Sequence, residues 1–243
     1  MSVETGRSGQ RPAPLIFDLD HTLWDFAANS KKSLIEGFEH FRLDLLGIES
    51  SEQWVNAFEV ANDRCWALYR SGEIDKSTLR TERFRLTLES LGCDDGELAV
   101  SLGVHYVEVS PLQTTLIEGS EALLSELAAR GHRMWVLTNG FEEVQRIKLA
   151  RCGLAQFFEA MYTSEQLGAK KPHAQAFFGA AQLAGLEPDE GIVMIGDSYG
   201  SDIIGAQNVG WRGVHYNPQD EVHEDAWRTV RQLREILDLE LNH

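Results

Sequence analysis

The sequence is poor in cysteine, and the few cysteines it has argue against covalent or metal cross-links. Of its 243 residues only three are cysteines, Cys65, Cys93 and Cys152, and no two of them form a CxxC pair. Disulfide frameworks and structural zinc sites need paired or clustered cysteines. We therefore expect reduced thiols and a cytoplasmic location.

Long apolar runs are absent as well. No stretch approaches the roughly 20 apolar residues that a helix needs to span a bilayer. Residues 1–14 are polar and lack the apolar segment of a secretory signal peptide. We expect these residues to form a flexible N-terminal tail, and we expect no membrane partner.

Basic residues are scarce relative to acidic ones. Lys and Arg number 22 against 38 Asp and Glu, which gives a formal net charge of −16. Nucleic acids bind through clustered Lys and Arg, so this balance argues against a nucleic-acid partner. An acidic chain that handles a phosphate must supply positive charge locally, from a metal ion, a few lysines or backbone N–H groups. The oligomeric state is left open.

The sequence does contain an alternation of short apolar strands and amphipathic helices. Buried strands are predicted at residues 15–17, 133–137, 191–195 and 213–216. Helices are predicted at residues 121–130, 141–152 and 174–184, each followed or ended by a glycine, and from about Asp225. This alternation predicts an α/β fold, with a doubly wound, Rossmann-like parallel sheet and helices on both faces.

Residues 26–109 break this alternation. They contain no convincing buried strand, and their apolar residues recur at helical spacing, as at Leu34, Phe38 and Phe41. We interpret this segment as an all-helical domain inserted into the α/β core. The core then comprises residues 15–25 and 110–243.

Polar residues cluster directly after the predicted strands and in one segment between them. In an open parallel sheet, ligands bind outside the carboxyl ends of the strands. We therefore expect these residues to converge at one edge of the sheet. They are Asp18 and Asp20 after the first strand, Thr138 and Asn139 after the second, Lys171 in a Lys-Lys-Pro segment, and Asp197 with Asp202 after the third.

The aspartates among these residues indicate a metal site. Asp18, Asp20 and Asp197 offer the hard oxygen ligands that Mg²⁺ prefers. Without a cation, crowded carboxylates would repel one another and partly protonate. A divalent ion removes this repulsion and supplies the positive charge that the composition lacks.

The remaining residues of the set favour an anion. Lys171 is a further cation able to hold a phosphate oxygen, and Thr138 and Asn139 stand at the start of a predicted helix, where backbone N–H groups bind anions. Each piece alone is more often a solvated turn or an ordinary helix start. The ordered set, however, predicts a phosphate-handling site with a carboxylate placed to attack.

The same ordered set resembles a known family. The segments DLDHT, LTNG, KKP and GDSYGSD look like the four signature motifs of the haloacid dehalogenase-like hydrolases. The resemblance extends over residues 15–216, and the helical insertion resembles the cap of that family. A finer similarity, to the 5′-nucleotidase branch of the family, is carried by the segments LTNGFEEVQR, RCGL and LYRSGEI.

The resemblance implies a role for each matched residue. Asp18 is expected to be the nucleophile and to form an aspartyl-phosphate, and Asp20 to be the general acid and base. Thr138, Asn139 and Lys171 are expected to bind the phosphoryl group. The implied cofactor is Mg²⁺, held by Asp18, Asp197 and the backbone carbonyl of Asp20, with Asp202 orienting its water ligands.

The resemblance also narrows the reaction. Dehalogenating members of the family lack the second aspartate of the first motif, whereas Asp20 is present here, so a phosphatase is preferred. The expected substrates are nucleoside 5′-monophosphates. The alternatives are another small phosphate ester, such as a sugar phosphate or phosphoglycolate, and a catalytically silent module that binds a phosphate ligand. In the helical insertion, Trp66 and Tyr69 are candidates for contact with the substrate, whereas Trp54 and Phe58 are assigned to packing.

Overall fold

The computed structural model describes residues 11–187, 190–223 and 226–242, which divide into two compact units. The α/β unit contains the chain up to Trp24, residues 116–142 and the chain from Gly153 onward; the helical unit contains residues 25–115 and 143–152. Of the predicted N-terminal tail, residues 1–10 lie outside the described residues, and Ala13 and Pro14 are buried. Within the described chain, no helix is both long enough and apolar enough to cross a membrane.

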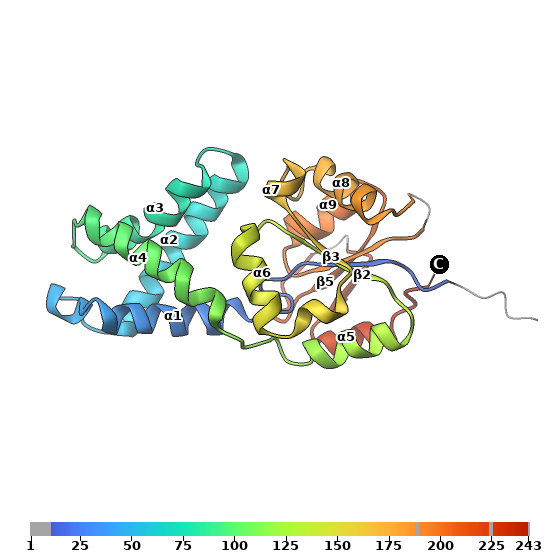
Figure 1. The fold of residues 1–243 in the computed structure, drawn as a ribbon, viewed down its shortest axis with the longest axis horizontal. Coiled ribbons are helices and arrows are strands. Elements are labelled where there is room, and N and C mark those ends of the chain that lie inside the picture. The colour runs from blue at the N-terminus through green and yellow to red at the C-terminus, as the bar shows by residue number, and fades with distance from the viewer. Residues whose placement is uncertain (1–10, 188–189, 224–225, 243) are drawn as a thin grey trace, which may run out of the picture. The chain divides into compact units, whose positions relative to one another are not determined.

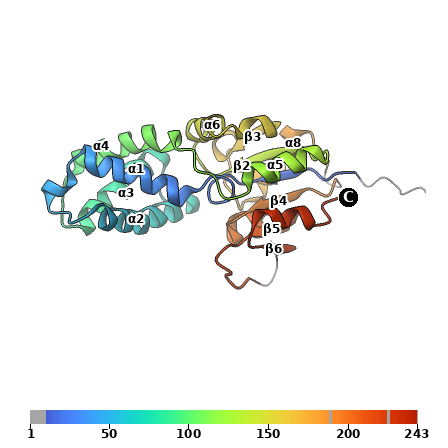
Figure 2. The same ribbon diagram turned by 90° about the horizontal axis from the view of Figure 1, so that it is seen from below.

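Six parallel strands form the sheet of the α/β unit, in the order β3-β2-β1-β4-β5-β6 (Figures 1 and 2). Their bounds are β1 Leu15–Phe17, β2 Met134–Thr138, β3 Ala160–Thr163, β4 Val193–Gly196, β5 Arg212–Tyr216 and β6 Arg228–Val230. Strand β1 lies between β2 and β4 and is fully buried, as a strand covered on both faces must be. The chain builds outward from β1 to β3 and then crosses to β4, so the strand order reverses beside β1, where α/β sheets bind ligands.

Helices cover both faces of this sheet. Figure 1 shows α8 (Ala174–Ala184) and α9 (Ile204–Gln207) on one face, and α5 (Ser120–Ala129) with the C-terminal 3₁₀-helix η5 (Leu233–Asp238) on the other. Side chains from neighbouring strands form the core under α8 because the register sets Ile16 opposite both Trp135 and Met194. Phe177 of α8 packs on this row and is fully buried.

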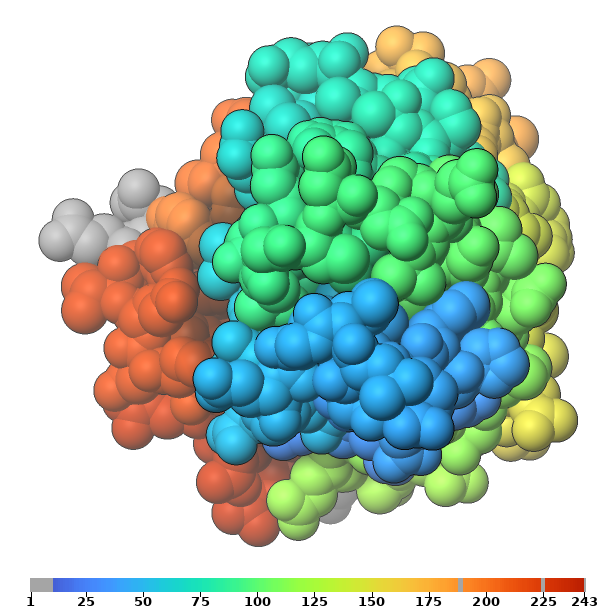
Figure 3. Space-filling model, turned by 90° about the vertical axis from the view of Figure 1, so that its left-hand side faces the viewer, coloured from blue at the N-terminus to red at the C-terminus, as the bar shows by residue number. Residues whose placement is uncertain are grey.

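The inserted segment of the helical unit, residues 25–115, contains four α-helices: α1 Phe26–His40, α2 Ser51–Ser71, α3 Lys76–Ser90 and α4 Gly96–Val109. Each begins after a residue whose side chain accepts a hydrogen bond from the first turn, and these N-caps are Asp25, Ser50, Asp75 and Asp95. On the face drawn in Figure 3, α4 (green) lies between α3 (teal) and the segment of α1 and η1 (blue). Trp54 and Phe58 pack inside this unit against Phe84, as expected.

The remaining helices are short or connect other elements. They are η1 Leu43–Leu46, η2 Ser110–Leu112, α6 Glu142–Arg151, η3 Leu154–Phe157, α7 Ser164–Leu167 and the π-helical turn η4 Tyr199–Ile203.

The predicted fold class is confirmed: the protein is an α/β protein with a parallel sheet and an inserted all-helical unit. Two local predictions need correction. Strand β3 was not predicted, because its apolar run, Ala160-Met161-Tyr162, is short and, at this edge of the sheet, only half-buried at Ala160 and Met161. The predicted C-terminal helix from about Asp225 is wrong. Asp225 itself lies outside the described residues, and the following segment forms β6 and η5.

The physical reason for the second error lies in the spacing of three buried residues. Val230, Leu233 and Ile236 recur every third position, which suits one side of a helix. Val230, however, pairs with Tyr216 at the edge of the sheet, and only Leu233 and Ile236 lie in a 3₁₀-helix. Pairing with the free edge of β5 therefore overrides the local helical pattern.

Candidate active site

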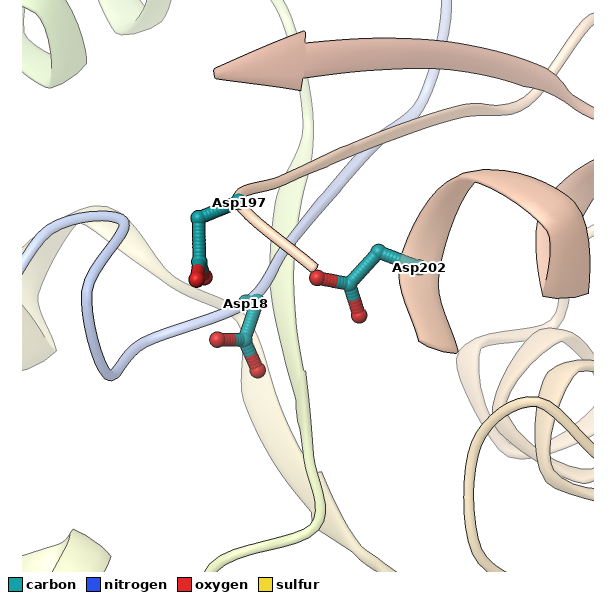
Figure 4. Close-up of side chains that lie close together, drawn as sticks. All are labelled: Asp18, Asp197 and Asp202. Atoms are coloured by element: carbon teal, nitrogen blue, oxygen red, sulfur yellow. The ribbon is translucent and has the colours of Figure 1, made fainter. Parts of the chain in front are cut away.

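Three aspartates converge at the carboxyl end of the sheet. Asp18 follows β1, Asp197 follows β4, and Asp202 lies in η4, the turn after Asp197. One carboxylate oxygen from each lies within 4.8 Å of the others, and Figure 4 shows the three side chains gathered around one point. The three carboxylates thus lie together at one edge of the sheet, as expected from the positions of Asp18 and Asp197 directly after parallel strands.

A buried lysine neutralises part of this charge. Lys171 is 2% exposed, and its Nζ lies 2.6 Å from Asp18 Oδ1 and 2.7 Å from Asp202 Oδ1. Its Nζ donates hydrogen bonds to Asp18 Oδ1 and, at 2.8 Å, to the backbone carbonyl of Leu137. Two carboxylates and a carbonyl thus surround the ammonium group, which offsets the cost of burying its charge.

Burial shifts the protonation of the whole group. It raises the pKa of Asp18 to about 7, against the opposing effect of Lys171 and with help from Asp202 and Asp20. It raises the pKa of Asp197 to about 6, with Asp18 adding to the effect, and it also raises the pKa of Asp202. For Lys171, burial alone would lower the pKa, but Asp18 and Asp202 outweigh it and hold the pKa above its ordinary value.

Asn139, which was expected to bind phosphate, has both side-chain atoms engaged with the lysine segment. Its Oδ1 accepts a hydrogen bond from the Lys171 backbone N–H at 2.8 Å, and its Nδ2 donates to the Lys171 carbonyl at 2.9 Å. This reciprocal pair anchors the peptide that carries Lys171 to the end of β2. Thr138, the last residue of β2, is buried, and its Oγ1 accepts from the Gly140 N–H at 3.0 Å.

Asp20 stands two residues beyond Asp18 and is half-buried. The segment around it folds back on itself, because the backbone N–H groups of Leu23 and Trp24 both bond to the carbonyl of Leu19. This tight turn keeps Asp20 next to Asp18, where its charge adds to the upward shift of the Asp18 pKa.

Thr22 contacts the site directly, and the sequence reasoning assigned it no role. It is fully buried, its Oγ1 donates to Asp197 Oδ1 at 2.9 Å, and it accepts from the Asp197 backbone N–H at 3.0 Å. The sequence offered one signal for this contact, a threonine four residues after the nucleophile candidate in the segment DLDHT. That the hydroxyl is buried is seen only in the structure. Thr22 sets the orientation of the Asp197 carboxylate.

Trp66 and Tyr69, the candidates for substrate contact, lie on α2 of the helical unit. Their rings meet edge to face with centroids 5.5 Å apart. Tyr69 is 6% exposed and Trp66 is half-buried, so Trp66 presents more surface to a ligand.

Gly196 allows Asp202 to reach the site. A Cβ on Gly196 would overlap the Asp202 carboxylate, whereas a Cβ on Gly200 would meet no atom within 4 Å. We therefore expect Gly196→Ala to lower the free energy of unfolding by about 1–3 kcal/mol, the usual cost of overpacking a buried site. Gly200→Ala is the matched control and should leave the stability unchanged or raise it slightly. Urea unfolding of the two variants tests this, and equal stabilities would contradict it.

The donor set fits a divalent cation such as Mg²⁺. Hard carboxylate oxygens are the ligands it takes. Burial, with a smaller contribution from neighbouring carboxylates, raises the pKa values of Asp18 and Asp197, and a bound cation would favour their ionised forms. Asp202 is less available, because its Oδ1 is paired with Lys171 and its Oδ2 accepts from the Ser198 N–H at 3.1 Å. Asp18 and Asp197 are therefore the side chains best placed to bind the ion.

Comparison with known proteins gives a consistent result. The family model for haloacid dehalogenase-like hydrolases matches residues 15–210. The pyrimidine 5′-nucleotidase YjjG of Escherichia coli is 30% identical, and the match covers 94% of this chain and 98% of that protein. The pyrimidine 5′-nucleotidase PynA of Streptococcus pneumoniae is 31% identical, and the match covers 92% of this chain and 93% of that protein. More distant relatives are named for other phosphate esters, among them glyceraldehyde 3-phosphate.

A solved structure agrees with the fold. The putative hydrolase YfnB of Bacillus subtilis, described as bound to magnesium, superposes with a TM-score of 0.83 at 25% identity. The match covers 94% of this chain and 98% of that one. The match therefore includes the helical unit as well as the sheet.

Proposed function

This chain belongs to the haloacid dehalogenase-like hydrolases and is a phosphoric monoester hydrolase, and from that premise we propose that it is a Mg²⁺-dependent nucleoside 5′-monophosphatase. The observation that carries the proposal is the buried contact of Lys171 with Asp18 and Asp202, beside Asp197. Such a site holds a carboxylate ready to attack and holds the positive charge that a phosphoryl group needs.

The proposed reaction uses two displacements. A carboxylate oxygen of Asp18 forms a bond to phosphorus while the ester P–O bond breaks, and Asp20 gives its proton to the leaving oxygen. Asp20 then takes a proton from the water that attacks the aspartyl-phosphate, which regenerates Asp18 and releases phosphate. Lys171 and Thr138 hold the phosphoryl oxygens. Asn139 positions Lys171 through its two hydrogen bonds to the Lys171 backbone.

In this proposal Asp18, Asp197 and the backbone carbonyl of Asp20 would hold the metal, and Asp202 would orient its water ligands. Bound there, Mg²⁺ neutralises charge on the phosphoryl group and keeps the carboxylates ionised. Two neighbouring residues fix the positions of these carboxylates. Thr22 orients the Asp197 side chain through its hydrogen bond, and Gly196, which has no Cβ, leaves room for the Asp202 side chain.

Mg²⁺ is expected to raise the unfolding temperature more at pH 8 than at pH 5. The folded-state pKa values of Asp18 (about 7) and Asp197 (about 6) exceed the ordinary 3.8. In the metal-free protein these groups contribute stability that is fully present below pH 3.8 and is lost as the pH rises through 6 to 7. Mg²⁺ binds the ionised form and must displace protons at pH 5. Thermal unfolding with Mg²⁺ or EDTA at both pH values tests this, and equal shifts would contradict it.

The choice of nucleotides rests on the relatives and on the helical unit. We take residues 26–109 as a cap that selects the part of the substrate beyond the phosphate, with Trp66 stacking on the base and Tyr69 supporting it. Trp66→Ala should raise the KM for nucleotides by about 5- to 100-fold, which corresponds to the loss of one base-stacking interaction. The KM for a sugar phosphate should change little. An unchanged ranking of substrates would contradict the stacking role.

The proposed compartment is the cytoplasm. None of the three cysteines, all of which lie in the described part of the chain, takes part in a disulfide, and this supports a reducing compartment.

Phosphate release from a panel of esters tests the function as a whole. The panel contains pyrimidine and purine nucleoside monophosphates, sugar phosphates and phosphoglycolate, each with Mg²⁺ and with EDTA. We expect Mg²⁺-dependent release concentrated on the nucleotides. Release spread over the sugar phosphates would keep the mechanism and overturn the nucleotide assignment, and tight ligand binding without release would indicate a silent binding module.

A further inference from the structure

His215 is a buried polar residue to which the proposed reaction gives no role. It lies on β5, opposite Gly196 of β4, so it borders the residue that precedes Asp197. It is 2% exposed, and its neighbours on the strand, Val214 and Tyr216, are buried apolar residues. A histidine inside such a strand needs a polar partner, because an unpaired buried polar group is costly.

That partner is the backbone of Asp197. His215 Nε2 lies 2.9 Å from the Asp197 carbonyl oxygen. A carbonyl oxygen can only accept, so Nε2 carries the hydrogen and donates it. The other ring nitrogen, Nδ1, is buried and has no hydrogen-bond partner among the residues that the structure describes. Within that part of the chain, the contact with Asp197 is thus the hydrogen bond that the His215 ring makes.

This bond completes the restraint of Asp197. Thr22 accepts from the Asp197 N–H and donates to its carboxylate, and His215 donates to its carbonyl. The His215 ring is itself packed against two others, with centroid distances of 5.5 Å to Tyr199 and 5.3 Å to His223. Tyr199 and His223 stack on each other at 4.0 Å, which holds the ring cluster together.

We infer that His215 is a positioning residue for the metal site: its Nε2–H fixes the Asp197 peptide and thereby the direction of the Asp197 carboxylate. The inference rests on the proposed binding of Mg²⁺ by Asp197. Outer partners of metal ligands commonly change metal affinity by about 10- to 100-fold when removed, because the ligand must then be ordered at the expense of binding energy.

Calorimetric titration with Mg²⁺ in the absence of substrate tests this inference. His215→Phe keeps a ring of similar size and removes the donor, and it should weaken the Kd for Mg²⁺ by about tenfold or more. His215→Gln keeps an N–H donor and should restore most of the affinity. In turnover, the Mg²⁺ concentration for half-activity should rise in His215→Phe while kcat at saturating Mg²⁺ stays near the wild-type value.

His132 offers a matched control. It too is buried, and its Nδ1 lies 2.9 Å from a backbone carbonyl, that of Ala13. It precedes β2 and therefore lies at the opposite, amino-terminal edge of the sheet. His132→Phe should lose stability comparable to that lost by His215→Phe, about 1 kcal/mol for one hydrogen bond, with no change in the Kd for Mg²⁺.

The outcomes separate the inference from the function on which it rests. If the wild-type protein binds Mg²⁺ and His215→Phe has the same Kd for Mg²⁺, the inference alone is overturned. It is also overturned if His215→Phe and His215→Gln weaken Mg²⁺ binding equally. No binding of Mg²⁺ by the wild-type protein would overturn the metal site and the inference with it. If His215→Phe does not fold, His215→Leu replaces it with the same expectation.

Discussion

Replacing Asp18 with asparagine is expected to lower the rate of phosphate release by about 10⁴-fold or more while the protein stays folded. The amide cannot form the aspartyl-phosphate, so the two-step route is closed, and losing a nucleophile typically removes nearly all the catalysis of such a group. The fold should tolerate the change, because burial already opposes ionisation of Asp18 and raises its pKa to about 7. Steady-state phosphate release and thermal unfolding in EDTA measure the two effects.

A control and a chemical readout make this result specific. Asp63→Asn makes the same replacement of a carboxylate oxygen by an amide nitrogen at an exposed aspartate of α2, and it should leave the rate unaltered. Acid-quenched wild-type enzyme should carry a phosphoryl adduct by intact-protein mass spectrometry, and Asp18→Asn should carry none. If Asp18→Asn turned over at a rate within tenfold of the wild-type rate, the assignment of Asp18 as the nucleophile would be wrong.

Replacing Lys171 with methionine is expected to cost both activity and stability. The rate should fall by about 10²- to 10³-fold, as when one charge-stabilising donor is removed from an active site. The free energy of unfolding at pH 8 should fall by about 3–5 kcal/mol, because Asp18 and Asp202 would remain buried without their cation. Urea unfolding in EDTA measures the loss.

The pH dependence of that loss distinguishes charge from packing. The folded-state pKa values of Asp18 and Asp202 are already raised, and removing Lys171 raises them further. The destabilisation should therefore be smaller at pH 5, where both carboxyls take up protons in the folded state, than at pH 8. Lys170→Met, one residue away and half-exposed, should cost no more than about 0.5 kcal/mol at either pH. An equal loss at pH 5 and pH 8 in Lys171→Met would mean that packing, not charge, is responsible.

The elements that sequence reasoning found share one property: their pattern is local. Buried strands such as 15–17 are apolar throughout, and α2 has both a serine N-cap and a terminal glycine. The elements it missed are the two edge strands, which are less buried than the central ones. β3 is only half-buried in its first two residues, and β6 has two exposed residues and becomes a strand because it pairs with the free edge of β5.

The sequence by itself determined at which edge of the sheet the aspartates Asp18, Asp197 and Asp202 lie. Residues that directly follow parallel strands must emerge at the same edge, so Asp18, Thr138 and Asp197 could be placed together without coordinates. Their order and spacing also sufficed to indicate the family, which the comparisons bear out.

Only the tertiary structure decided how those groups pair. Lys171 contacts Asp18 across 153 positions of the chain, Asn139 grips the Lys171 peptide, and Thr22 holds Asp197. These pairings depend on hydrogen-bond geometry at the scale of tenths of an ångström, and the raised pKa values depend on the exclusion of water by packed neighbours. Neither quantity is a property of residue type or spacing, because both arise only when distant segments close over one another and remove the site from solvent.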